Sequence, residues 1–168
     1  HLVVGLLAER AGGTFKAHRR GRADVVETRL GPPPGVRVVL ARPRSYMNLS
    51  GGPVASLSDY YRIGTDRLVA VHDELDLPYG SLRLKRGGGD NGHNGLRSVR
   101  SALGTGDFLR VRFGIGRPPG RMDPAAYVLK PWSAAERKDL DLHVEQAADA
   151  VEALVVHGLA HAQNEFNR

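Results

Sequence analysis

Apolar residues recur at helical spacing in four parts of the chain. Those within residues 2–7 predict a helix that ends near Gly12, although residues 2–6 equally fit a buried strand. Ser133 opens a capping-box pattern, and the apolar stripe after it predicts a long helix that ends at Gly158 and packs on a sheet. Two shorter helices are predicted at about 52–61 and 96–103.

Strand-like runs lie between these helices. Residues 24–30 and 36–41 are rich in β-branched side chains, and the prolines between them predict the loop of a hairpin or of two neighbouring strands. Residues 68–73 are almost continuously apolar, which predicts a buried parallel strand at the centre of the sheet. Shorter alternating runs at 81–85 and 110–115 predict two more strands.

This alternation, without repeats, predicts one α/β domain over residues 1–168, with a mixed, twisted sheet flanked by helices. The chain is 41% apolar and 25% charged and has no long uncharged apolar run, which argues against a disordered or membrane-spanning protein. Because there is no cysteine, disulfides, thiolate metal sites and a cysteine nucleophile are excluded.

Positive charge is concentrated in the first three quarters of the chain. The formal net charge is +6; residues 1–122 carry 20 basic and 10 acidic side chains, and residues 123–168 carry 4 and 8. All but four of the 24 basic residues are arginine, which binds phosphate through two parallel hydrogen bonds. This pattern predicts a polyanionic partner for the first part of the chain, unless an arginine-rich coding bias alone raised the charge.

Polar clusters follow two of the predicted strands, at the ends where α/β sheets bind ligands. Residues 46–50 follow one strand, and the cluster 72–74 follows the apolar strand. Asp73 is well placed to orient a histidine base, but a carboxylate that only satisfies the backbone of the turn before Leu77 is the more common case.

A glycine-rich segment, residues 87–95, precedes a predicted helix and is bracketed by basic residues. Its backbone N–H groups could approach an anion, and His93 and Asn94 at its end could donate hydrogen bonds. It matches neither the phosphate loop of nucleotide hydrolases nor a dinucleotide-binding loop, and a surface loop remains the alternative.

Four segments together resemble the bacterial peptidyl-tRNA hydrolase family. They are residues 46–51 (Tyr-Met-Asn-Leu-Ser-Gly), 72–78 (His-Asp-Glu-Leu-Asp-Leu-Pro), 87–97 with Gly-Gly-Gly and Gly-His-Asn-Gly-Leu-Arg, and 113–118 (Phe-Gly-Ile-Gly-Arg-Pro). They occur in the family's order and at similar spacing along the whole chain. The resemblance implies a cytoplasmic, monomeric enzyme that needs no metal or other cofactor and cleaves the ester between a peptide and the 3′ ribose of tRNA.

The resemblance also implies roles for individual residues. Asp73 would orient the catalytic histidine, and Asn48 and Asn94 would bind the ester, the acceptor end and the attacking water. Tyr46 would pack against the terminal nucleotide or the peptide. His93 would support the site, and Lys85 and Arg112 would clamp the 5′ phosphate of the tRNA.

The start of the chain departs from the family pattern. The segment that carries the family's general-base histidine has no counterpart, and His1 does not match that histidine. We therefore expect the domain to be N-terminally incomplete or internally deleted near residues 1–7, with an open sheet edge and poor turnover, unless His93 or His72 substitutes as base. The alternative is a non-catalytic RNA-binding module on the same scaffold, although such a module would not need the orienting carboxylate.

Overall fold

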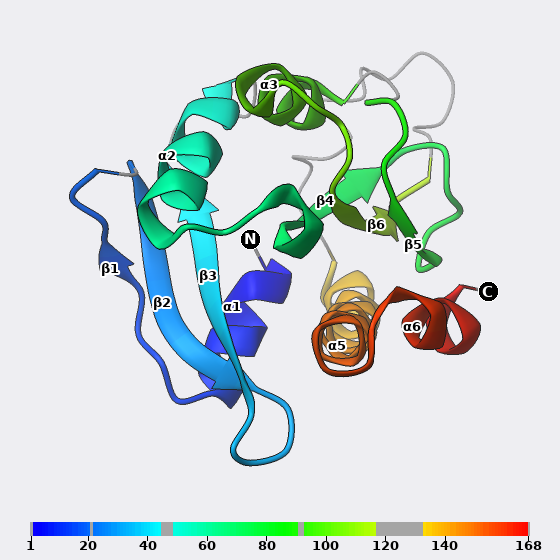
Figure 1. The fold of residues 1–168 in the computed structure, drawn as a ribbon. Coiled ribbons are helices and arrows are strands. Elements are labelled where there is room, and N and C mark those ends of the chain that lie inside the picture. Colours follow the sequence, from blue (N-terminus) through cyan, green and yellow to red (C-terminus); the bar gives the residue numbers. More distant parts are fainter. Residues whose placement is uncertain (1, 21, 45–48, 91–92, 117–132, 168) are drawn as a thin grey trace.

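Two small sheets with helices packed around them form the protein in a computed structural model, which describes residues 2–20, 22–44, 49–90, 93–116 and 133–167 (Figure 1). In the first sheet, β1 (Lys16–Ala17), β2 (Ala23–Leu30) and β3 (Val36–Pro43) are antiparallel neighbours in that order. In the second, β6 (Leu109–Gly114) lies between β4 (Val69–Glu74), which is parallel to it, and β5 (Leu82–Arg86), which is antiparallel.

Four of the five α-helices in the described part of the chain lie close to the predicted positions, whereas the last α-helix and the short 3-10 helix were not predicted. The helices are α1 (Leu2–Arg10), α2 (Gly51–Tyr61), α3 (Asn94–Leu103), α5 (Ala134–His157) and α6 (Leu159–Phe166), with a short 3-10 helix η2 (Thr65–Arg67). The first segment is a helix, so the alternative of a strand over residues 2–6 is wrong. No helix in the described part of the chain is long and apolar enough to span a bilayer.

The α/β fold class and the mixed strand directions are confirmed, but the described strands belong to two sheets, and β4 is not central. It forms an edge of the second sheet in this part of the chain. Its apolar run has another cause, because both of its faces are covered. Leu68 and Ala70 pack against the cluster around α3, whereas Val69 and Val71 pack against the main core.

The long helix α5 joins the main core to both sheets, as its apolar stripe predicted (Figure 1). Its buried residues meet side chains from α1, from β2 and β3, and from β5 and β6 in one cluster. The buried stripe of α5 consists of Val144, Ala147, Ala148, Ala150, Val151 and Leu154. This shared core fixes the second sheet, which carries the candidate residues Asp73, Lys85 and Arg112, against the rest of the domain.

A close approach between α2 and α3 positions the other side of the site. The backbone N–H of Gly51 donates to the Ser98 hydroxyl at 2.8 Å, and a Cβ on Gly51 would overlap the carbonyl oxygen of Ser98. Only glycine therefore fits at the start of α2, where the chain leaves the predicted polar segment 46–50.

Candidate active site

Asp73 and His93, which are 20 residues apart in sequence, meet where β4 approaches the start of α3. The Nε2 of His93 lies 3.0 Å from Oδ1 of Asp73, and its Nδ1 accepts the backbone N–H of Leu96 at 3.1 Å. A neutral imidazole has one donor and one acceptor nitrogen, so both contacts are satisfied when Nε2 carries the proton. His93 thus caps α3 while it donates to the carboxylate.

The same hydrogen bond keeps Asp73 ionised. Donation from His93 is the main cause that lowers the pKa of Asp73, and it outweighs the opposing effect of burial. The carboxylate stays negative well below neutral pH. This agrees with the predicted role of Asp73 as an orienting carboxylate, and it does not fit the alternative in which Asp73 only satisfies a turn.

His72 lies beside this pair but faces a drier environment. Its ring makes an edge contact with the His93 ring at 5.0 Å between centroids, and its Nδ1 donates to the backbone oxygen of Asp73 at 2.9 Å. Burial lowers the pKa of His72 to about 4. Its buried Nε2 has no hydrogen-bond partner among the described residues, so an unprotonated nitrogen remains next to the Asp73–His93 pair.

The two histidines differ as substitutes for the expected base. Both nitrogens of His93 are engaged, so its lone pair is not free to accept a proton from water. In His72, the Nε2 lone pair is unengaged by the described residues, but its low pKa makes it a weak base at neutral pH. The geometry therefore favours a supporting role for His93, as predicted.

The predicted amide and aromatic residues are only partly placed. Asn94 is the first residue of α3 and is exposed beside His93. Tyr46 and Asn48 lie outside the described residues.

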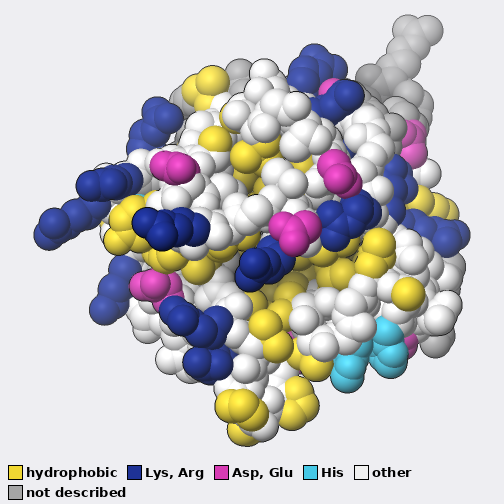
Figure 2. Space-filling view, viewed as in Figure 1, with side chains coloured by type: hydrophobic (Ala, Val, Ile, Leu, Met, Phe, Trp, Pro, Cys, Tyr) yellow, Lys and Arg dark blue, Asp and Glu magenta, His cyan; other side chains and the backbone are white. Residues whose placement is uncertain are grey.

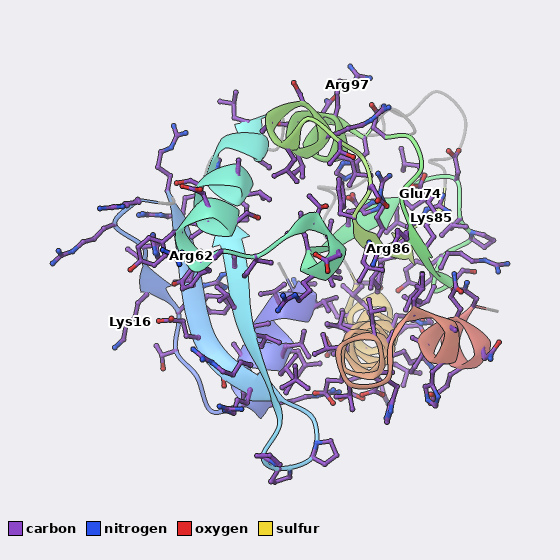
Figure 3. All side chains as sticks on the ribbon, in the orientation of Figure 1. Lys16, Arg62, Glu74, Lys85, Arg86 and Arg97 are labelled. Atoms are coloured by element: carbon purple, nitrogen blue, oxygen red, sulfur yellow. The ribbon has the colours of Figure 1, made fainter. Side chains whose placement is uncertain are left out.

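The predicted phosphate clamp lies in the second sheet, on two neighbouring strands. Lys85 in β5 and Arg112 in β6 are close enough that Arg112, with burial as the larger cause, lowers the pKa of Lys85. Arg112 forms an ion pair of 3.5 Å with Glu74, whose side chain is only 4% exposed. Figure 3 labels Glu74, Lys85 and Arg86 together on this side of the molecule. The structure thus brings both clamp residues together, but it gives Arg112 a buried carboxylate as its partner.

Arg110 is a structural residue that the sequence did not reveal. It is 1% exposed, it donates to the carbonyl oxygens of Gly88, Gly89 and Gly106, and its guanidinium lies 4.5 Å from the Phe108 ring centroid. In the sequence it was only the first position of the alternating run 110–115. The glycine loop therefore directs at least two carbonyl groups inward to Arg110, and the loop is anchored at its start.

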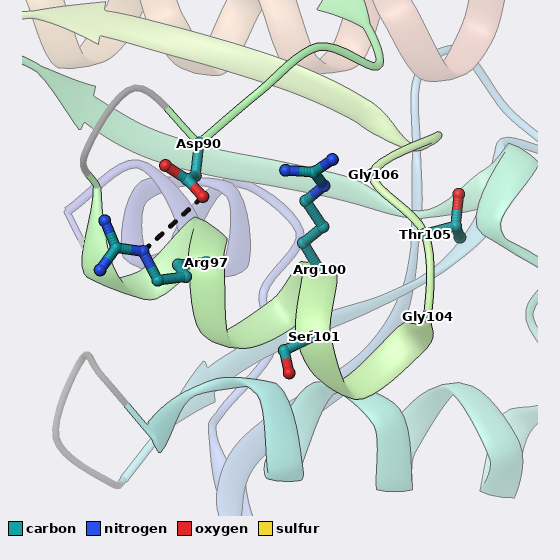
Figure 4. A pocket seen from close by; sticks show the side chains of 7 residues that line it. All are labelled: Asp90, Arg97, Arg100, Ser101, Gly104, Thr105 and Gly106. Carbon is teal, nitrogen blue, oxygen red and sulfur yellow. Dashed lines mark ion pairs between the residues drawn. The ribbon is translucent and has the colours of Figure 1, made fainter.

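Next to this loop, a broad hollow of about 580 Å³ lies against α3 and residues 104–106 (Figure 4). Arg97 and Arg100 line it, and the Nε of Arg97 lies 3.7 Å from Oδ2 of Asp90. Arg97 and Arg100 thus place two further cations on the α3 side of the glycine loop.

The described residues contain no group of three or more His, Asp or Glu side chains arranged to hold a metal ion.

Comparisons with known proteins give a family match over the whole of the given chain. A family model described as peptidyl-tRNA hydrolase matches residues 1–168. A peptidyl-tRNA hydrolase from Frankia casuarinae is 62% identical over 166 residues, which are 99% of this chain and 82% of the relative. One from Streptomyces coelicolor is 59% identical over 168 residues, covering 99% of this chain and 84% of the relative.

Solved structures show the same fold. The crystal structure of peptidyl-tRNA hydrolase from Acinetobacter baumannii matches with a TM-score of 0.86 and 34% identity, covering 98% of this chain and 82% of that one. These matches do not test the expected incompleteness near residues 1–7 or the expected poor turnover, and both stay predictions. Sequence, fold and site agree that the chain belongs to the peptidyl-tRNA hydrolase family.

Proposed function

We propose that this protein hydrolyses the ester of peptidyl-tRNA at the Asp73–His93 site. The hydrogen bond of 3.0 Å between these two side chains is the observation that carries the proposal. An ionised, partly buried carboxylate can orient the general base of a hydrolytic reaction, and a molecule that only binds RNA has no use for it. The clamp residues lie on the strands of the same sheet, so a polyanionic substrate would be held close to the carboxylate.

In this proposal each side chain has a separate task. Asp73 accepts the hydrogen bond from His93. Because the Nδ1 of His93 is already occupied by the Leu96 N–H, His93 has a supporting role and is not the base. Asn94 and Asn48 donate amide hydrogen bonds to the ester oxygen as negative charge develops on it. Tyr46 packs against the terminal nucleotide or the peptide, and Lys85 with Arg112 binds the 5′ phosphate.

Asp73→Asn is the direct test, because it keeps the shape of the side chain and removes the charge. We expect kcat for a blocked aminoacyl-tRNA to fall by about 10²- to 10⁴-fold, whereas KM changes little. Asp66→Asn, which removes an exposed carboxylate in η2, serves as the matched control and should leave kcat unchanged.

Two results would contradict the proposal. One is an Asp73→Asn variant with the kcat of the unmodified protein. The other is an unmodified protein that binds tRNA but hydrolyses no ester, which would favour the RNA-binding module instead. Turnover within about tenfold of another family member would contradict the separate prediction of poor activity.

The family resemblance also supports a monomer that acts in the cytoplasm without a metal or other cofactor. Hydrolysis should then be unchanged by a chelator, and the protein should elute as a single copy in size-exclusion chromatography. Loss of activity with the chelator would contradict the metal-free reaction.

A further inference from the structure

A second hollow, of about 380 Å³, lies between β1, β2 and the C-terminal end of α2. Lys16, Arg19 and Arg20 line it on the side of β1, and Tyr60 and Tyr61 line it on the side of α2. None of these residues belongs to the site around Asp73. Its volume is at the lower end of what small ligands occupy, which is suitable for about one nucleotide unit.

An aromatic cluster forms one wall of this hollow. The ring of Tyr60 meets the rings of His18 and Tyr61 edge-on, with centroids at 4.5 and 4.9 Å. Tyr60 is nevertheless 52% exposed, which is unusual for a large aromatic side chain within a cluster. The neighbouring rings therefore hold Tyr60 in a fixed orientation while leaving much of its surface open to a ligand.

Positive charge surrounds this exposed ring. The Arg20 guanidinium lies 5.9 Å from the centroid of Tyr60, and Lys16 and Arg19 are exposed beside it. Glu27 is the carboxylate among the lining residues, but no ion pair joins it to these three cations in the described part of the chain. Lys and Arg side chains also gather along this edge of the molecule in Figure 2, and Figure 3 labels Lys16 and Arg62 there.

An exposed, fixed aromatic ring bordered by unneutralised cations is the combination that binds a nucleic-acid strand. The ring stacks on a base or a ribose, and the cations contact the adjacent phosphates. An acidic peptide would use the cations but would leave the ring without a partner. The hollow therefore fits RNA better than it fits a protein segment.

We propose that this hollow binds a stretch of the tRNA substrate away from its ester, with phosphates at Arg19 and Arg20 and a base or ribose on Tyr60. The proposal rests on the proposed function for the identity of the RNA. The hollow on the first sheet would be a second tRNA contact, in addition to the clamp of Lys85 and Arg112 on the second sheet. Binding of tRNA would then depend on residues that take no part in hydrolysis.

Binding of deacylated tRNA and of a labelled six-uridine RNA, followed by fluorescence anisotropy, tests this without any ester. We expect the double variant Arg19→Gln/Arg20→Gln to bind both RNAs more weakly. The slope of log K against log salt should fall by about 0.7 for each phosphate that is no longer neutralised. The matched control is Arg37→Gln with Arg137→Gln, which removes two exposed arginines elsewhere and should leave both affinities unchanged.

The ring is tested separately from the charge. Tyr60→Leu should weaken binding of both RNAs by about 5- to 100-fold, whereas Tyr60→Phe keeps the stacking surface and should bind as the unmodified protein does. Equal melting temperatures of the variants would establish that the fold is retained.

Each outcome separates this proposal from the proposed function. Weaker tRNA binding with unchanged kcat at saturating substrate supports the hollow as a substrate contact. Weaker six-uridine binding with unchanged tRNA binding would overturn the assignment to the substrate, and unchanged binding of both would overturn the site itself. Failure of the Asp73→Asn test alone would leave these binding measurements intact.

Discussion

Burial of His72 makes the folded protein less stable at low pH. Its pKa is about 4 in the folded protein and about 6.5 when exposed. The unfolded chain therefore binds a proton between these pH values and the folded protein does not. Above pH 6.5 His72 therefore does not reduce the free energy of unfolding. As the pH falls through 6.5 towards 4, the free energy of unfolding decreases.

From this difference we expect His72 alone to lower the free energy of unfolding by about 2 kcal/mol between about pH 7.5 and about pH 5. His72→Gln cannot titrate, so its free energy of unfolding should fall by that much less over the same range. Urea denaturation at the two pH values measures the difference. If both proteins showed the same loss over this range, His72 would not be neutral in the folded state.

At the scale of elements, α2 and α3 are joined where the backbone of Gly51 meets Ser98. Gly51 donates to Ser98 and has no space for a Cβ, because the obstructing atom is a carbonyl oxygen of α3 that cannot move without shifting the helix. α3 also carries the His93 cap and begins with Asn94. Displacement of these helices would therefore move the site as well as the core.

We expect Gly51→Ala to lower the free energy of unfolding by about 1–3 kcal/mol, since the overlap is with backbone. Gly5→Ala provides the matched comparison. Gly5 lies inside α1 and no atom stands within 4 Å of the point where a Cβ would lie, so this change should stabilise by about 0.5–1 kcal/mol. Denaturation curves of the two variants with opposite shifts would confirm that space, and not helix propensity, governs position 51.

Local sequence patterns predicted most helices and strands, because the spacing of apolar residues and the capping residues lie within a few positions of one another. The β2–β3 hairpin and the stripe of α5 are examples. The central place predicted for β4 was wrong, since its apolar run reflects the covering of both its faces by helices and core and not its place in the sheet.

In the candidate site, too, some residues could be predicted from the sequence and others could not. Their positions at a strand end and at the end of the glycine loop made Asp73 and His93 candidates, and the family resemblance added their roles, with which their contact agrees. The inward-facing Arg110 was missed because its partners are carbonyl oxygens of a distant loop and of residue 106, which no residue type reveals. Hydrogen bonds to backbone oxygen leave no signature in the sequence of the acceptor.

For the whole molecule, the uneven charge has a structural counterpart. The basic clamp is on the second sheet, whereas α5 and α6 belong to the part of the chain with excess acidic residues. The α6 side chain of Gln163 and the adjoining Asn167 instead bond to the backbone of Leu84, and so they cover the outer edge of β5. Gln163 and Asn167 thus stabilise the clamp strand without adding positive charge to it.

This arrangement identifies Lys85 as the better test of the clamp. Removing Arg112 would leave the buried Glu74 without its ion-pair partner, and an unpaired buried charge costs about 3–5 kcal/mol of stability. Lys85 is only half-buried and forms no ion pair with a described residue. A substitution there changes charge with less effect on folding.

Lys85→Gln should weaken binding of tRNA carrying a 5′ phosphate and reduce the slope of log K against log salt by about 1. Lys138→Gln removes the same charge from the exposed face of α5 and should leave the slope unchanged. Repeating the titration with tRNA that lacks the 5′ phosphate should abolish the difference between Lys85→Gln and the unmodified protein, because the contact is then absent in both. A difference that persists without the 5′ phosphate would place the Lys85 contact elsewhere on the tRNA.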